Sequence, residues 1–306
     1  MRVLLVGQAA FAAEVLQRLA AAGDTIAGAV CPPDAGGKPD PFKQAAEQRG
    51  VPVHQFRSLK TPEARRAFED ARADLAALVY VTQIVPEALL HIPRLTSICF
   101  HPSLLPRYRG GSAIAWQLIR GETRTGVTVF WPDAGIDTGP ILLQRDAPVD
   151  PDDTAGTLYY RTLYPLGVQT VVDAVALIRE GRAPRLAQDE SAASYDPLCT
   201  DEHAAVDWSR PAAEVHNLIR GCDPQPGART VWRETPLRLY EPRRVAGTAG
   251  ATPGTVLSLA PDGIVVACAG GDAVRCARIR NGGTKAAAAD VAHTIGLAAG
   301  SRLGPV

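Results

Sequence analysis

Residues 99–116 read C-F-H-P-S-L-L-P-R-Y-R-G-G-S-A-I-A-W, and residues 125–144 read T-G-V-T-V-F-W-P-D-A-G-I-D-T-G-P-I-L-L-Q. At the start of the first segment, a short run of strand-forming residues, 97–100, leads into His101. Pro102 comes next, and because proline has no backbone N–H it stops sheet pairing and turns the chain away. We therefore expect the imidazole of His101 to lie at the end of a strand.

The second segment predicts a strand at 126–131 that ends in a tight turn rich in Gly and Asp, which carries Asp137. Two neighbouring strand ends would present His101 and Asp137 to one crevice, where open α/β sheets bind ligands. A histidine beside a carboxylate can exchange protons with a substrate near neutral pH. The alternative is structural: a hydrogen-bonded histidine at a strand end and an aspartate that caps its own turn.

Strand and helix patterns alternate on the N-terminal side of these segments, which predicts a doubly wound, mostly parallel sheet with helices on both faces. The expected elements are strands at 2–6, 25–30, 51–53 and 75–80 and helices at 8–22, 41–48 and 62–72. Gly7 follows the first strand, but the second and third glycines of a dinucleotide-binding turn are absent. We therefore expect no bound NAD.

Helices are expected at 112–119 and from Asp152 or Asp153 to about Glu180. The pattern changes past Asp207, where a helix at 211–220 is followed by five short strands with Gly and Pro turns. These strands predict a small open β-barrel of the OB type. The expected domains are a catalytic domain at 1–182, a linker at 183–205 and the barrel domain at 206–306.

Composition narrows the function classes. The chain has 306 residues, 46% of them hydrophobic, and 32 Lys and Arg balance 32 Asp and Glu. No global charge therefore points to nucleic acid or a membrane surface. The apolar run at 1–7 is too short for a signal peptide or a membrane span, so we expect a cytoplasmic protein. Six cysteines without C-x-x-C spacing argue against a zinc site or a disulfide framework, and we expect no metal.

The motif H-P-S-L-L-P-R-Y-R-G-G-S-A-I, followed 36 residues after His101 by Asp137 in D-A-G-I-D-T-G, resembles the folate-dependent formyltransferase family. The resemblance extends from the first strand to about Lys285. It is greatest to the N-terminal hydrolase domain of 10-formyltetrahydrofolate dehydrogenases, through G-G-K-P-D-P (36–41) and A-E-V-H-N-L-I-R-G (213–221), and the methionyl-tRNA formyltransferases are also similar. It implies a formyl-donor domain followed by an open barrel.

The resemblance also implies roles for individual residues. His101 and Asp137 match the catalytic pair, and 10-formyltetrahydrofolate is the expected co-substrate. The segment Gln83, Ile84 and Val85 matches a folate-contacting segment, and the loop of Asp133, Ala134, Gly135 and Ile136 matches one that wraps the pterin. Ser103, Arg107 and Arg109 lie in the loop after His101, where the arginines would meet the folate tail or an anionic acceptor, or would be ordinary solvated loop residues.

One position departs from the transferase pattern N-x-H, because residue 99 is Cys. A thiol is a poor hydrogen-bond donor, and losing one donor to the oxyanion costs on the order of 3 kcal/mol. Oxyanion support would then come from protonated His101 and the backbone. Cys99 is expected to be an apolar filler; the alternative is a nucleophile, since Cys99 and His101 are two residues apart and share a strand face.

These observations predict an enzyme that hydrolyses 10-formyltetrahydrofolate or transfers its formyl group to a small amine. The first alternative is a methionyl-tRNA formyltransferase, although residues 207–306 hold only 12 Lys and Arg against 8 Asp and Glu, a weak positive balance for binding tRNA. The second is a folate-binding protein without catalytic activity. The identity of the acceptor and the oligomeric state do not follow from the sequence.

Overall fold

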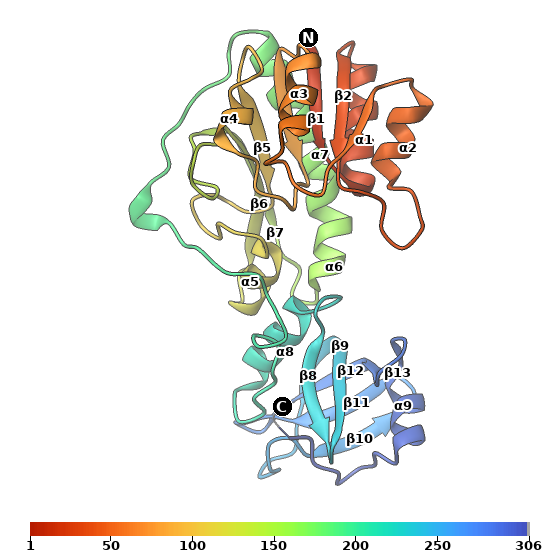
Figure 1. The fold of residues 1–306 in the computed structure, drawn as a ribbon. Helices are drawn as coiled ribbons and strands as arrows, with labels where there is room; N and C mark the ends of the chain where they lie inside the picture. Colours follow the sequence, from red (N-terminus) through yellow and green to blue (C-terminus); the bar gives the residue numbers. More distant parts are fainter. Residues whose placement is uncertain (305–306) are drawn as a thin grey trace. The chain divides into compact units, whose positions relative to one another are not determined.

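The structure is a computed structural model that describes residues 1–304, and these form two compact units (Figure 1). Unit 1 consists of residues 1–111, 126–147 and 162–195. Unit 2 consists of residues 112–125, 148–161 and everything from Asp196 onward that the structure describes. The domain boundaries expected from the sequence, at 182 and 206, stay a proposal.

Unit 1 is built on a seven-stranded sheet in the order β3-β2-β1-β4-β5-β6-β7. The strands are β1 (Arg2–Gly7), β2 (Thr25–Cys31), β3 (Val53–Gln55), β4 (Leu75–Val79), β5 (Ser97–His101), β6 (Arg124–Phe130) and β7 (Ile141–Pro148). Strands β1 to β5 pair in parallel, whereas β5 and β6 are antiparallel. The predicted doubly wound, mostly parallel architecture is confirmed, and His101 is the last residue of β5.

Helices cover both faces of this sheet (Figure 1). They are α1 (Ala9–Ala21), α2 (Pro41–Gln48), α3 (Pro62–Asp70), α4 (Glu87–Leu90) and α7 (Tyr164–Arg179). On one face, α3 and α4 pack with β1 and β4 in an apolar cluster to which Cys99 also belongs. On the other face, the ring of Phe100 packs against the ring of Phe11 of α1, tilted by 31° with centroids 4.6 Å apart, and lies against Gly167 of α7. Neighbouring residues of β5 thus point to opposite faces, as a strand requires.

The helix expected from Asp152 or Asp153 to Glu180 is present as a continuous helical stretch over 155–179 that contains one π-helical turn. A short helix α6 (Ala155–Leu158) is capped by Thr154, whose hydroxyl accepts a hydrogen bond from the backbone of Thr157. A π-helical turn (Tyr159–Leu163) follows, and α7 begins beyond it with a proline in its first turn. Because proline lacks the backbone N–H, the regular hydrogen-bond ladder cannot run through this point.

Unit 2 contains an open antiparallel sheet in the order β10-β11-β12-β9-β8, with β13 beside β12. Its elements are α5 (Ala113–Ile119), α8 (Ala212–Gly221), β8 (Ala228–Trp232), β9 (Thr235–Ala246), β10 (Val256–Ala260), β11 (Gly263–Ala267), β12 (Asp272–Arg280), β13 (Ala286–Ala287) and α9 (Ala288–Ile295). All five predicted strands are present, and β13 is a sixth that the sequence pattern did not indicate. None of the helices within residues 1–304 combines the length and apolar character needed to cross a bilayer.

A buried histidine makes the stability of unit 2 depend on pH. His216 of α8 is 4% exposed, and burial, with Arg220 next in effect, lowers its pKa to about 4. The unfolded chain therefore takes up this proton first as the pH falls, and folding loses stability from pH 6.5 down to about 4. We expect a loss of about 3 kcal/mol in the free energy of unfolding over that range, measured with urea.

The control for this prediction is His216→Gln, which has no proton to bind in this pH range. The difference between wild type and variant isolates the histidine from the carboxylates that titrate over the same interval. Equal pH slopes for the two proteins would contradict the prediction.

Candidate active site

The ring of His101 is held between a backbone carbonyl and a carboxylate. Its side chain is 7% exposed, its Nε2 lies 2.7 Å from Tyr108 O, and its Nδ1 lies 3.5 Å from Asp137 Oδ2. A carbonyl only accepts, so Nε2 must carry a hydrogen that it donates to Tyr108 O. A second proton, on Nδ1, makes the ring cationic and turns an N–H toward Asp137. This arrangement therefore accommodates an imidazolium beside a carboxylate.

Asp137 is fixed from the opposite side by the loop that follows His101. The backbone N–H of Gly110 donates a hydrogen bond of 2.8 Å to Asp137 Oδ2. Asp137 itself has a φ of +57°, a left-handed conformation that aspartate tolerates better than most residues. Among residues 1–304, no side chain or backbone N–H donates to its Oδ1. Oδ2 is thus hydrogen-bonded to the protein, and Oδ1 can accept a proton from a bound substrate.

The two residues meet by a different route from the one expected. Neighbouring strand ends were expected to bring them to one edge, but β6 runs antiparallel to β5, so that His101 pairs with Thr128 and Cys99 pairs with Phe130. The end of β6 therefore points away from the end of β5. The loop of residues 131–140 turns back along the sheet, closed by a 2.9 Å hydrogen bond from Trp131 N to Pro140 O, and it carries Asp137 to His101.

The loop after His101 is shaped by buried polar contacts. Ser103, which is 0% exposed, donates from its hydroxyl to Arg107 O at 2.7 Å. The hydroxyl of Thr128 in β6 donates to Ser103 O at 2.7 Å, and the N–H of Leu105 donates to that hydroxyl at 3.2 Å. Ser103 thereby holds the loop that contains Tyr108, whose carbonyl meets His101. A direct contact of Ser103 with substrate stays a prediction.

The guanidinium of Arg109 is paired with two residues of unit 1, Glu190 and Gln188. Its guanidinium is 8% exposed and makes a two-pronged ion pair with Glu190, at 2.9 Å and 2.7 Å. It also donates to Gln188 Oε1 at 2.8 Å. The pKa of Arg109 is raised, chiefly by the hydrogen bond to Glu190. The suggested contact of Arg109 with the folate tail stays a prediction, as does that of Arg107, whose guanidinium lies over the Tyr108 ring.

Gln188 is a site residue that sequence reasoning missed. Its Nε2 donates to Asp137 O at 2.8 Å and to Gly139 O at 2.7 Å, while its Oε1 accepts from Arg109. It thus joins the loop that carries Asp137 to the loop that carries Tyr108. Gln188 lies in the stretch 183–205, which has no helical or strand periodicity and is typical of a linker, so no local pattern indicates its role.

We expect Gln188→Ala to lower the rate of the reaction that uses Asp137 by up to about 100-fold, because a displacement near 1 Å at a reacting group has that effect. The loss should appear in kcat more than in KM. Gln188→Glu should do the same, because it keeps the acceptor for Arg109 but loses the donors to Asp137 O and Gly139 O.

The matched control is Gln169→Ala, which removes an exposed glutamine of α7 whose side chain donates to Asp173 Oδ1 at 2.9 Å. Equal kcat values for the Gln188 and Gln169 variants would show that Gln188 does not position Asp137. Urea unfolding of each variant separates a loss of folded protein from a loss of rate.

The side chain of Cys99 lies in apolar surroundings. It is partly buried and packs against the cluster formed by β1, β4, α3 and α4. Burial raises the pKa of its thiol well above the usual value, and the charge of Asp137 acts in the same direction. A thiol held protonated is a poor nucleophile. The packing and the raised pKa therefore favour the apolar filler over the formyl-accepting nucleophile.

The segments expected to contact folate lie in two loops of unit 1. Gln83 donates from Nε2 to Phe56 O at 3.0 Å, and its Oε1 is buried with no partner among residues 1–304. Gln83 also lines a small hollow with Gly7 and Tyr80, beyond the ends of β1 and β4. Ile84 is 71% exposed, and Val85 packs against the apolar cluster beneath the sheet.

The second loop is ordered by its own aspartate. Asp133 Oδ1 accepts from the N–H of Gly135 at 3.0 Å and from the Thr138 hydroxyl at 2.5 Å. Ala134 and Ile136 lie between these contacts, and Ile136 is 48% exposed. Exposed Ile84 and Ile136 are apolar surface that a flat ring could cover. Within residues 1–304, no three His, Cys, Asp or Glu side chains form a group suited to a metal ion.

Comparisons with known proteins agree with this geometry. A family model described as Formyl transferase matches residues 1–175, and one described as Formyl transferase, C-terminal domain, matches residues 199–294. The chain is 42% identical over 245 residues to the cytosolic 10-formyltetrahydrofolate dehydrogenase of Xenopus laevis, covering 78% of this chain and 27% of that protein. The chain thus spans about a quarter of that relative's length.

A second relative is matched along nearly its whole length. The methionyl-tRNA formyltransferase of Trichlorobacter lovleyi is 38% identical over 279 residues, which is 89% of this chain and 87% of that protein. Among solved structures, an N-formyltransferase from Helicobacter canadensis in complex with folinic acid and dTDP-3-aminofucose has a TM-score of 0.69 at 17% identity. That comparison covers 90% of this chain and 98% of the other, and at this identity it shows a shared fold.

Proposed function

Because this chain belongs to the formyl transferase family, we propose that it removes the formyl group of 10-formyltetrahydrofolate and passes it to water or to a small amine. The observation that carries the proposal is the contact of His101 Nδ1 with Asp137 Oδ2 at 3.5 Å, in a loop arrangement that commits only one oxygen of Asp137. The name of the Xenopus relative supports 10-formyltetrahydrofolate as the donor. A cytoplasmic location, expected from the sequence, belongs to the same proposal.

In the proposed reaction the two side chains divide the proton transfers. Asp137 takes a proton from the water or amine as its oxygen or nitrogen bonds to the formyl carbon. Cationic His101 stabilises the charge on the oxygen of the tetrahedral intermediate. When the bond from that carbon to the folate nitrogen breaks, His101 gives this nitrogen the proton on its Nδ1 and recovers one from Asp137, while Nε2–H stays bonded to Tyr108 O. The products are tetrahydrofolate and either formate or an N-formyl amine.

The proposal assigns the folate ring to the loops that contain Gln83–Val85 and Asp133–Ile136. Exposed Ile84 and Ile136 supply apolar contact, and the unpartnered Oε1 of Gln83 supplies a hydrogen-bond acceptor. A buried acceptor without a partner is costly, which makes a ligand donor at that atom favourable.

The test is to incubate purified protein with 10-formyltetrahydrofolate, with and without candidate amines, and to measure tetrahydrofolate. Release without amine indicates hydrolysis, and release that depends on an amine indicates transfer. No tetrahydrofolate under either condition would refute the proposal.

A second candidate function is formylation of methionyl-tRNA, because the Trichlorobacter relative is matched along most of its length. Residues 207–306 hold 12 Lys and Arg against 8 Asp and Glu. The excess of positive charge that could contact tRNA phosphates is therefore modest. Formylation of charged initiator tRNA, compared with small amines under the same conditions, separates the two candidates.

Position 99 provides a further prediction. Cys99→Asn restores the amide donor of the N-x-H pattern, and one oxyanion donor is worth about 3 kcal/mol, or roughly a 100-fold change in rate. We expect transfer to an amine to rise, at some cost in stability, because the amide enters an apolar cluster. Cys99→Ala, the control, should leave the rate near that of wild type. An unchanged rate in Cys99→Asn would remove this account of residue 99.

A further inference from the structure

A second cavity lies in unit 2, apart from the site that contains His101. Its volume is about 660 Å³, which is within the usual range for small-molecule pockets. Helix α8 forms one wall with Ala213, His216, Asn217 and Arg220, and the loops at 121–123 and 149–152 and the end of β9 complete it. The proposed formyl transfer uses none of these residues.

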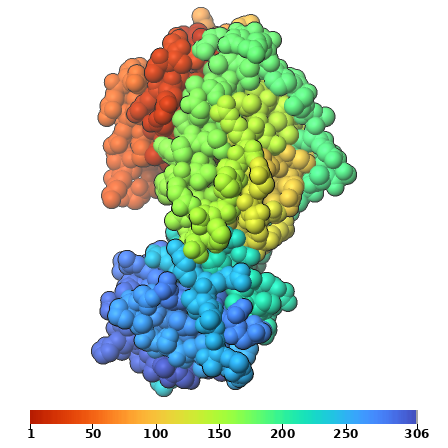
Figure 2. Space-filling view, turned by 180° about the vertical axis from the view of Figure 1, so that it is seen from behind, coloured from red at the N-terminus to blue at the C-terminus, as the bar shows by residue number. Residues whose placement is uncertain are grey.

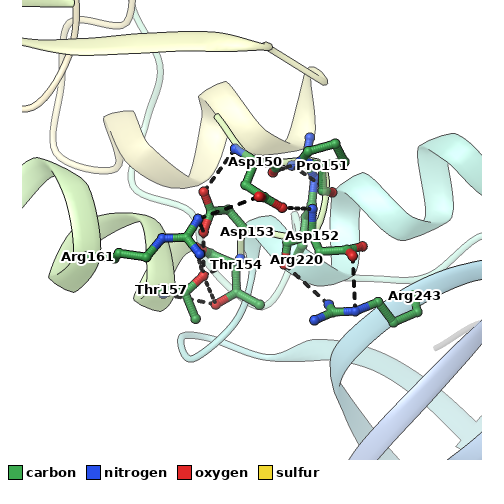
Figure 3. A network of polar contacts seen from close by, with 9 residues as sticks. All are labelled: Asp150, Pro151, Asp152, Asp153, Thr154, Thr157, Arg161, Arg220 and Arg243. Carbon is green, nitrogen blue, oxygen red and sulfur yellow. Dashed lines mark hydrogen bonds and ion pairs between the residues drawn. The ribbon is translucent and has the colours of Figure 1, made fainter. Parts of the chain in front are cut away.

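Arg220 brings an incompletely paired charge to this cavity. It is 5% exposed, and its Nε donates to Asn217 Oδ1 at 2.9 Å. Within the described part of the chain, its Nη1 makes two long contacts of 3.4 Å, to the carbonyls of Asp150 and Pro151 (Figure 3). Its Nη2 has no hydrogen-bond partner among residues 1–304. A buried guanidinium normally uses most of its five donors, so Arg220 retains capacity for a ligand.

His216 lies one turn before Arg220 on the same face of α8. It is 4% exposed, lines the cavity, and has no hydrogen bond to either ring nitrogen among residues 1–304. The absence of a partner for the buried Nε2 is unusual, because buried polar atoms are nearly always hydrogen-bonded. Burial is the largest cause of its low pKa, followed by Arg220; Arg243 and Arg244 of β9 also lower it, and only Asp152 opposes them. The potential at His216 is therefore positive.

The carboxylates near α8 are largely engaged by other cations. Figure 3 shows Asp153 with Arg161 and Thr157 on one side of the network and Asp152 with Arg243 on the other. Arg244 lines the cavity, is exposed, and has no ion-pair partner within residues 1–304. Glu122 and Asp272 also line it, so a bound anion is favoured at the wall formed by His216 and Arg220.

We propose that this cavity binds a small oxyanion, the carboxylate or phosphate group of a small molecule, through the charges of Arg220 and Arg244 and a hydrogen bond from His216. A guanidinium is well suited to such a group because its donors match the spacing of two oxygens. A neutral histidine ring carries one N–H, which supplies the hydrogen bond. The ligand in turn satisfies a ring that the protein leaves without a partner.

The experiment follows the ring proton of His216 by NMR in the full chain, with inorganic phosphate in one arm and acetate in the other. Saturable shifts with phosphate alone identify a phosphate site, and saturable shifts with acetate alone identify a carboxylate site. Arg244→Gln should weaken binding at least fivefold, while Arg233→Gln, an exposed arginine outside the cavity, should not. Both variants remove surface charge and are expected to fold.

A pH series with sulfate, which does not titrate between pH 4 and 8, tests the role of His216. A bound anion raises the pKa of His216, so sulfate affinity should rise as the pH falls from 7 toward 5. The protein with His216→Phe should lose that dependence. No saturable shift with any of the three anions, or an equal loss in Arg233→Gln and Arg244→Gln, would overturn the proposal, and neither outcome bears on activity with 10-formyltetrahydrofolate.

Discussion

His101→Ala is expected to lower kcat for release of tetrahydrofolate by about 10²- to 10⁴-fold, the usual range for losing a group that transfers protons. The ring is held by Tyr108 O at 2.7 Å and by Asp137 at 3.5 Å. Alanine removes both the cation that stabilises the tetrahedral intermediate and the proton that the folate nitrogen needs in order to leave. The measurement is the initial rate with saturating 10-formyltetrahydrofolate.

The matched control is His91→Ala, which removes a histidine whose side chain is 60% exposed. A comparison of donor affinity in His101→Ala and wild type then separates binding from catalysis. Unchanged affinity with a lost rate is the expected result. Unchanged affinity with no turnover in either protein would favour a folate-binding protein without catalytic activity, the alternative that the sequence left open.

The sequence predicted the fold well because the signals involved are local. Strand and helix periods identified the parallel half of unit 1, and Pro102 predicted His101 at a strand end, where the structure has it. The direction of β6 could not be predicted in the same way, because a strand's period is the same whether it pairs in parallel or antiparallel. The meeting of His101 and Asp137 therefore depends on a loop path that only three-dimensional structure reveals.

The residues that support the site could not be predicted from the sequence, for a related reason. The sequence around Arg109 is compatible with a ligand-binding or a solvated residue, whereas its partners Gln188 and Glu190 are about 80 positions later in the chain. Contacts at that separation leave no periodic signal. The cavity beside α8 could not be predicted either, since the helical pattern around His216 predicts only a buried face. A buried polar side chain such as His216 points to a binding site only when the structure shows that it lacks a hydrogen-bond partner within residues 1–304.

Asp137→Asn is expected to reduce kcat to a similar extent, about 10²- to 10⁴-fold, while leaving the fold intact. An asparagine oxygen can still accept the hydrogen bond from Gly110 N, now 2.8 Å from Asp137 Oδ2, so the loop should keep its position. The amide cannot take a proton from water or an amine, and it no longer balances the charge of cationic His101. Circular dichroism and urea unfolding provide the check that the variant is folded.

The double variant His101→Ala with Asp137→Asn decides whether the two residues act together. If Asp137 works partly by keeping His101 cationic, removing the second residue after the first should cost little more, as in other catalytic groups that act as a unit. Losses that multiply would instead mean that the residues act independently, with Asp137 serving only as the base for the acceptor. The 3.5 Å contact between them favours the first outcome, because a cationic ring and a carboxylate at this distance attract each other directly.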